Sequence, residues 1–176
     1  MLFRPLDLAG AVLVEPVRLA DERGFFARVF CEEEFAAAGL PTRFPQCNVS
    51  FNASKGTVRG MHFQCAPYED PKLVRCSRGA IFDVIVDLRP GSPTHLRSVG
   101  VELTEENGLA LYVPPGFAHG FQTLADGTEV FYQMGEVYVP DLARGIRWDD
   151  PAIDVRWPLP VAVISERDRT YPDYAT

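Results

Sequence analysis

The chain has 176 residues, 47% hydrophobic and 23% charged, which is typical of one soluble globular domain with a sizeable core. Its net charge of −7 argues against a nucleic-acid partner, whose phosphates it would repel. No apolar run is long enough for a membrane span, and the N-terminus does not resemble a secretory signal. We expect one cytoplasmic domain over residues 1–176, with its four cysteines buried and reduced.

The first forty residues predict short strands and one helix, because proline and glycine recur throughout. Residues 11–17 are expected to form a strand broken by a proline, and the turn at 21–24 to lead into a second strand over 25–30. Residues 32–39 predict a helix, with acids at its start, alanines within it and a glycine at its end.

Strands dominate the rest of the chain. They are expected over residues 58–64, 73–76, 80–88, 99–103, 109–113, 121–124 and 130–134, with turns between them. No internal repeat, low-complexity tract or linker interrupts the pattern. It predicts an antiparallel β domain with a tail, and leaves sandwich, barrel and jelly roll as alternatives.

The strand over residues 58–64 carries unusual polar groups. In the run Val58-Arg59-Gly60-Met61-His62-Phe63-Gln64, apolar residues alternate with a guanidinium, an imidazole and a carboxamide. Because burying charge is costly without a partner, these side chains predict a cavity or a ligand. A core histidine with satisfied hydrogen bonds is the alternative for His62 taken alone.

The chain has three histidines, His62, His95 and His119, and no H-x-H pair. A metal site would need several converging His and carboxylate ligands, so we expect no metal. His95 lies in a polar turn and is expected to be solvated. His119 lies between glycines, which allow close approach to a ligand, although a turn histidine bonded to backbone is the alternative.

Three further side chains have, taken one at a time, an ordinary structural explanation. Lys72, at the start of a strand, is typical of a solvated edge charge. Tyr132 should point away from Phe131 and is typical of a core tyrosine, and Asp168 is typical of surface charge. None of the three predicts a site alone.

Seven stretches of the chain together resemble one known family. They are Asp21-Glu22-Arg23-Gly24-Phe25-Phe26, Gln46-Cys47-Asn48-Val49-Ser50, Arg59-Gly60-Met61-His62-Phe63-Gln64, Lys72-Leu73-Val74-Arg75-Cys76, Phe82-Asp83-Val84-Ile85-Val86-Asp87-Leu88-Arg89, Pro115-Gly116-Phe117-Ala118-His119-Gly120-Phe121, and Trp148-Asp149-Asp150-Pro151-Ala152-Ile153 ahead of Trp157-Pro158. In this order the chain resembles the dTDP-4-dehydrorhamnose 3,5-epimerases. The resemblance implies an all-β, cupin-type antiparallel jelly roll with short peripheral helices. It also implies a homodimer without metal or cofactor that acts on a nucleotide sugar in deoxysugar biosynthesis.

The resemblance implies roles for the catalytic residues. Epimerisation beside a C4 ketone needs a base on one face of the sugar, an acid on the other and a charge sink for the enolate oxygen. His62 would be the base and Asp168 its partner. Tyr132 would return a proton from the opposite face, and Lys72 would stabilise the oxyanion.

The resemblance also implies a substrate-binding set. Arg59 and His119 would contact the diphosphate or sugar, and the Phe26 ring would pack on the nucleobase. The nucleotide or sugar would be held by Arg23, Gln46, Asn48 and Arg167, while Tyr138 would either contact substrate or pack a loop.

Two positions depart from the family pattern within the binding set. Arg28 stands where the family usually has Glu, and Ala143 where it often has Glu. Arg28 reverses a charge, so thymidine is the first choice of nucleotide and another sugar nucleotide the second. The alternatives are an epimerase acting at a single centre, a non-catalytic sugar-nucleotide-binding cupin and a metal-dependent cupin oxygenase.

Overall fold

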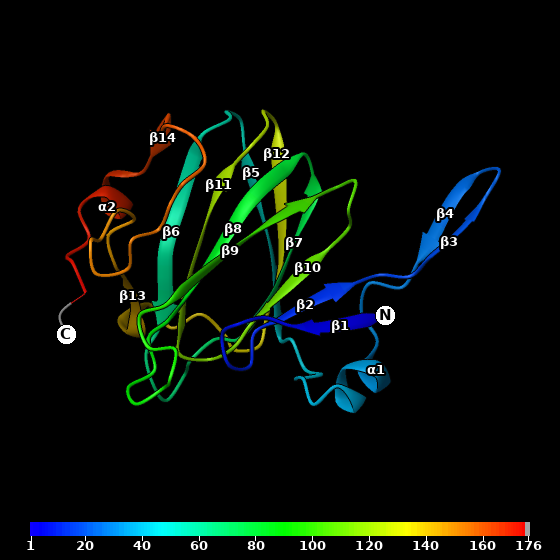
Figure 1. Cartoon of the computed structure of the whole chain (residues 1–176), viewed down its shortest axis with the longest axis horizontal. Helices are drawn as coiled ribbons and strands as arrows, with labels where there is room; N and C mark the ends of the chain where they lie inside the picture. Colours follow the sequence, from blue (N-terminus) through cyan, green and yellow to red (C-terminus); the bar gives the residue numbers. More distant parts are fainter. Residues whose placement is uncertain (175–176) are drawn as a thin grey trace.

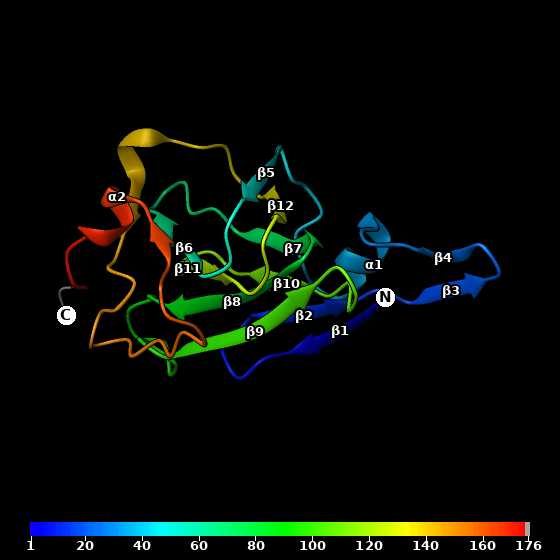
Figure 2. The same ribbon diagram turned by 90° about the horizontal axis from the view of Figure 1, so that it is seen from above.

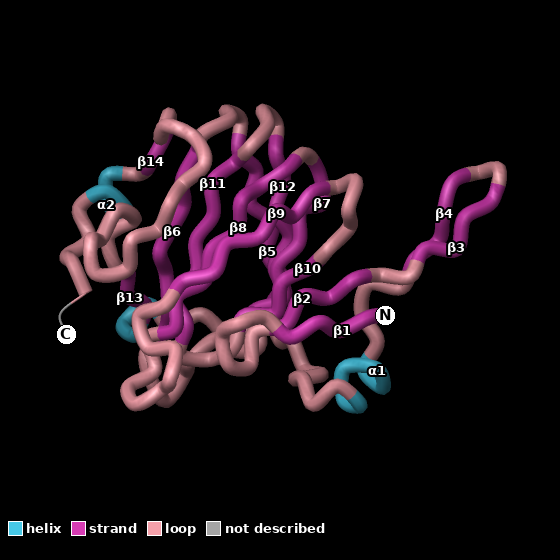
Figure 3. Tube along the Cα trace, viewed as in Figure 1, coloured by secondary structure: helices cyan, strands magenta, loops and turns pink. Residues whose placement is uncertain are grey.

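The computed structural model describes residues 1–174 and consists mainly of antiparallel strands (Figures 1 and 3). One six-stranded sheet has the spatial order β1 (Leu2–Pro5), β2 (Val12–Glu15), β10 (Ala110–Val113), β7 (Lys72–Arg78), β12 (Thr128–Met134) and β5 (Gln46–Asn52). The second has the order β13 (Ala143–Gly145), β6 (Thr57–Gln64), β11 (Phe117–Thr123), β8 (Ala80–Asp87) and β9 (Ser98–Thr104), with β14 (Val163–Ile164) parallel to β6. We call these the first and the second sheet.

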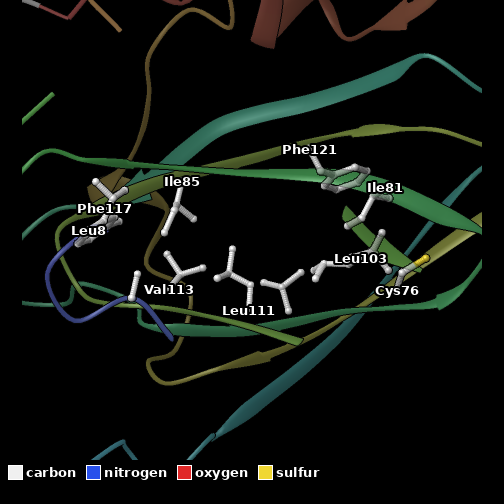
Figure 4. Close-up of a cluster of buried hydrophobic side chains, with 12 residues drawn as sticks. Leu8, Cys76, Ile81, Ile85, Leu103, Leu111, Val113, Phe117 and Phe121 are labelled. Atoms are coloured by element: carbon white, nitrogen blue, oxygen red, sulfur yellow. The ribbon is translucent and has the colours of Figure 1, made fainter. Parts of the chain in front are cut away.

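The main core lies between the two sheets (Figure 4). Ile81 and Ile85 of β8 and Phe121 of β11 pack against Leu111 and Val113 of β10, all fully buried. Their spacing of two or four residues along each strand puts them on one face, as the strand period requires. The alternation of side chains along the strands and their burial therefore identify the same face of each sheet as the one that packs on the other sheet.

The outer face of the second sheet is also covered. Val84 and Val86 of β8 pack with Ile146 and Ile153, which belong to the C-terminal tail. Burial on both faces explains why the sequence of β8 is a nearly continuous apolar run rather than an alternating one. The tail also contains the 3₁₀ helix η1 (Pro140–Leu142) and the helix α2 (Glu166–Arg169).

A two-stranded hairpin, β3 (Arg18–Asp21) and β4 (Gly24–Ala27), projects from one end of the molecule (Figures 1 and 2). We call it the projecting hairpin. The helix α1 (Glu32–Ala37) lies near its base and buries Phe35 against the first sheet, whereas α2 and the tail lie at the opposite end. Phe26 of β4, which pairs with Leu19 of β3, is 72% exposed.

The all-β class, the antiparallel sheets and the helix after residue 31 are confirmed, with differences in detail. Strands β1, β3, β5, β13 and β14 were not predicted, and β11 begins at Phe117 rather than at 121. β5 was not predicted because its inward side chains are polar, while Val49 and Phe51 face outward and are exposed.

Two predictions about single residues are corrected. All four cysteines are free, but only Cys76 is buried. Cys31 and Cys65 are partly exposed, and Cys47 is exposed because it lies on the outward face of β5. His95 is only partly exposed rather than solvated, because its Nε2 atom is buried and its ring packs edge-on to Tyr174. In residues 1–174 no helix has the length and apolar character that crossing a membrane requires.

Candidate active site

A cavity of about 320 Å³ opens between the two sheets. The predicted site residues that line it are Asn48, Arg59, His62, Lys72, His119, Tyr132, Tyr138 and Arg167. They come from β5, β6, β7, β11, β12, α2 and the segment after β12, so residues distant in sequence converge. Asp168 lies directly behind His62, and the Gln46 amide donates to Asn48 Oδ1 at 3.2 Å.

A bulge in β6 directs two of these side chains into the cavity. His62 pairs with His119, whereas Arg59 pairs with Phe121, so β6 has one residue more than β11 across this interval. Gly60 lies within the bulge with a φ of +127°, and a Cβ there would lie 2.5 Å from Gly120 Cα. Only glycine fits this approach of the two strands.

The candidate base is held by a buried carboxylate. Asp168 Oδ1 lies 2.7 Å from His62 Nε2, and its Oδ2 accepts the backbone N–H of Gly60 at 3.1 Å. Burial would raise the pKa of Asp168, but the hydrogen bond and charge of His62 outweigh it and hold that pKa below its ordinary value. The ionised carboxylate fixes the proton on Nε2 and leaves the lone pair on Nδ1. The His62 side chain, 45% exposed, can therefore act as a base.

The opposite wall of the cavity carries Tyr132, whose ring lies edge-on to His119 with centroids 6.0 Å apart. His119 Nε2 is in turn 2.8 Å from Asp83 Oδ1, and both side chains are buried. Burial and the negative charge of Asp83 raise the pKa of Tyr132. The phenol therefore stays protonated at neutral pH and can act as an acid.

Lys72 is buried rather than solvated, since β7 lies inside the first sheet between β10 and β12. Its Nζ lies 3.0 Å from the Asp70 carboxylate, which also lines the cavity. This pairing compensates for the burial of the lysine, and its ammonium group still lines the cavity.

Two buried amides hold the mouth of the cavity in place. Gln64 donates to Val137 O at 3.1 Å and accepts from Val139 N at 2.8 Å, which fixes the segment that carries Tyr138. Asn52 Oδ1 accepts from Arg59 Nε at 2.7 Å and orients the guanidinium. Arg59, Lys72 and Arg167 together favour an anionic ligand, although the whole chain is acidic.

Three predicted binding residues lie away from this cavity. Arg23 and Phe26 are on the projecting hairpin, where the Arg23 guanidinium bonds the Asp21 carboxylate at 2.6 Å. Arg28 follows the hairpin and pairs with Glu34 at 2.8 Å. The chain does not bring these residues to its own cavity.

Three side chains of this site that the sequence did not predict are Ser50, Asp70 and Asp83. Asp83 carried a usable signal, because an acid within the apolar run of β8 has to be paired when buried. Within residues 1–174, no three His, Cys, Asp or Glu side chains gather as a metal site would require.

Comparison with known proteins gives consistent results. Residues 5–176 match the family described as dTDP-4-dehydrorhamnose 3,5-epimerase. The chain is 46% identical, over 98% of its length and 89% of the relative's, to an epimerase of that name from Sinorhizobium fredii. It is 38% identical to a dTDP-4-dehydrorhamnose 3-epimerase from Streptomyces niveus, over 96% of this chain and 82% of that one.

Among solved structures, a dTDP-4-dehydrorhamnose 3,5-epimerase from Bacillus anthracis, with TDP and PPi bound, superposes with a TM-score of 0.95. It is 40% identical and covers 98% of both chains. These similarities confirm the resemblance inferred from the motifs and the predicted cupin-type fold.

Proposed function

Because the chain belongs to the dTDP-4-dehydrorhamnose 3,5-epimerase family and is an isomerase of this class, we propose that it inverts C3 and C5 of dTDP-4-keto-6-deoxyglucose. The reaction would take place in the cavity between the sheets, in the cytoplasm, as a step of dTDP-rhamnose biosynthesis. The TDP bound to the Bacillus anthracis relative supports a thymidine nucleotide.

The observation that carries this proposal is the placement of His62 and Tyr132. His62 belongs to β6 in the second sheet and Tyr132 to β12 in the first, and both line one cavity. A sugar ring held between the sheets would therefore have a base on one face and an acid on the other. Removing a proton from one face and returning it to the other inverts the carbon.

The reaction follows from the charges of the site. His62 takes the proton beside the C4 ketone, and the Asp168 carboxylate stabilises the imidazolium that forms. Lys72 stabilises the enolate oxygen from within the first sheet. Tyr132, neutral because of its burial, then protonates the carbon from the other face.

The nucleotide diphosphate would be bound at the mouth of the cavity. Arg59 offers a planar guanidinium already oriented by Asn52, a geometry suited to bidentate phosphate contacts. Arg167 and His119 line the same cavity, and Gln46 and Asn48 offer amides on the adjacent edge strand.

The working form would be a homodimer in which the projecting hairpin serves the partner's cavity. Leu19, Phe25 and Phe26 of the hairpin are 57–72% exposed, too much apolar surface for a hairpin to present to water. Edge strand β5 presents Val49 and Phe51 beside the cavity, and pairing of two copies would cover such surfaces. Arg23 and Phe26 would then reach a site that they cannot reach in their own chain.

The test is turnover of dTDP-4-keto-6-deoxyglucose in deuterated water, followed by mass spectrometry and proton NMR. Deuterium at both C3 and C5 with an L-configured product supports the 3,5-epimerase. A folded protein that incorporates no deuterium with this substrate contradicts the proposal.

A second candidate function is epimerisation at C3 alone. It is favoured by the similarity to the Streptomyces niveus 3-epimerase and by Ala143, which lines the cavity where the family pattern often has Glu. The same residues would carry both reactions, and deuterium at C3 alone would identify this alternative.

A further inference from the structure

Ser50 lies beside the candidate acid. It belongs to β5, and its side chain lines the cavity together with Asn48 and Tyr132. Asn48 is the direct cross-strand partner of Tyr132, and Ser50 pairs with Val130. Ser50 is therefore the diagonal neighbour of Tyr132 on the same face, a position within reach of an aromatic side chain.

The Ser50 hydroxyl is buried and has no hydrogen-bond partner among residues 1–174. A buried hydroxyl without a partner destabilises a protein, and most such groups in folded proteins are paired. Alanine would pack the same position without this penalty. The hydroxyl is therefore a donor without a partner on the wall where Tyr132 would change its charge.

The phenolate of Tyr132 would form in unfavourable surroundings. Burial and the nearby Asp83 carboxylate disfavour its negative charge, whereas Arg59 and the Ser50 hydroxyl favour it. Arg59 already donates to Asn52 Oδ1 and is expected to bind the diphosphate, so its guanidinium is not available to the phenolate alone. Ser50 is the neutral donor free to turn toward the phenolate oxygen.

We propose that Ser50 is a positioning residue for Tyr132, whose hydroxyl donates a hydrogen bond to the phenolate formed when Tyr132 protonates the sugar carbon. The inference rests on the proposed function. In that step the Tyr132 O–H bond breaks, its electron pair stays on the phenol oxygen, and a C–H bond forms at the enolate carbon. Ser50 keeps its own proton and only turns it toward the new charge.

The test compares Ser50→Ala with Ser50→Thr in deuterated water, following product formation and deuterium in recovered substrate. Ser50→Ala should lower kcat by about 10- to 100-fold with little change in KM, because a hydrogen bond to a charged group is lost only after substrate binds. Deuterium should still enter recovered substrate, since His62 is untouched. Ser50→Thr keeps the hydroxyl and should restore most of the rate.

A matched control is Ser77→Ala on β7, where the serine is exposed and bonds the Glu129 carboxylate at 2.7 Å. It should retain wild-type kcat. An unchanged rate in Ser50→Ala would overturn the inference, as would equal loss of rate and exchange in both Ser50 variants, which would mean a structural role. A wild-type protein that neither converts nor exchanges the substrate would instead reject the proposed function, and this inference with it.

Discussion

Arg59 and His62 are three residues apart on β6, yet both side chains face the same cavity. In a regular strand they would point to opposite faces. The bulge at Gly60 reverses the alternation, and its freed N–H donates to the Asp168 carboxylate that holds His62. One backbone irregularity thus places the phosphate-binding candidate and the candidate base side by side.

Gly60→Ala should therefore destabilise the protein more than an ordinary glycine substitution. The new Cβ would lie 2.5 Å from Gly120 Cα, so backbone has to move, in addition to the strain of φ at +127°. Strain and overpacking together should lower the free energy of unfolding by about 3–5 kcal/mol, which corresponds to a fall of about 10 °C in Tm. Thermal unfolding followed by circular dichroism measures the change.

Gly24→Ala is the matched control. Gly24 has a φ of +126° but no atom of its own chain within 4 Å of its would-be Cβ, so within the chain this variant introduces strain alone. Its Tm should fall by only about 3–6 °C, on the same conversion. Equal losses in the two variants would show that the contact with β11 does not matter.

Sequence predicted the strand of His62 but not the bulge within it. A glycine in a strand is compatible with several conformations, and the need for Gly60 depends on Gly120, sixty residues away on β11. The hydrogen bond that Asp168 accepts from the Gly60 N–H has the same origin, because this N–H is free only where the β6–β11 ladder is interrupted. The roles of His62, Tyr132 and Asp168 came from family resemblance, since neither period nor composition identifies partners across a sandwich.

The prediction of strands failed where tertiary contacts decide burial. Val49 and Phe51 are apolar but exposed, and Ser50 between them faces the cavity, so the pattern of β5 is inverted. Arg23 and Phe26 were assigned to the binding site, and the chain alone does not bring them there. A second copy supplies the missing contact only in the proposed dimer.

His62→Asn and Tyr132→Phe should have different effects on hydrogen exchange. Without the base, no carbon-bound hydrogen of the substrate should exchange with deuterated water. Without the phenol, His62 can still remove and return a proton on its own face, so exchange should persist while inverted product falls by about 10²- to 10⁴-fold. Mass spectrometry of recovered substrate and product distinguishes the two, and normal turnover in Tyr132→Phe would require another acid.

Lowering the pH should reduce the folding stability of the protein through protonation of Asp87. Burial would raise the pKa of this carboxylate, but bonds from Arg89, Ser92 and Thr94 outweigh it and hold the pKa far below its ordinary value. A group with a lowered folded pKa stabilises the protein fully above its unfolded pKa of about 3.9. That stability is lost progressively as the pH falls below this value.

The variant Asp87→Asn isolates this contribution. It should lower the free energy of unfolding by about 2–3 kcal/mol at pH 7, because charge-assisted hydrogen bonds to Arg89 are lost. Urea unfolding at pH 7 and pH 3 should show a smaller difference from wild type at pH 3, where the advantage of the ionised carboxylate has begun to fade. A difference that stays constant across this range would rule out the ionised carboxylate as its source.

If the projecting hairpin serves the partner's cavity, two inactive variants should complement each other. His62→Asn disables its own cavity, and Arg23→Ala disables the hairpin it lends to its partner. In a mixed dimer, the cavity of the Arg23→Ala chain keeps His62 and receives an intact hairpin. Random reassociation of equal amounts should recover about a quarter of wild-type activity, since half of the dimers have one complete site.

Mixing His62→Asn with Tyr132→Phe is the control, because both residues line the same cavity of one chain. Neither cavity of that mixed dimer is complete, so its activity should stay at the level of the separate variants. Native mass spectrometry verifies that mixed dimers have formed. Mixed dimers of the Arg23 and His62 variants without any gain in kcat/KM would place Arg23 outside the partner's site, and a monomer in sedimentation would contradict the dimer itself.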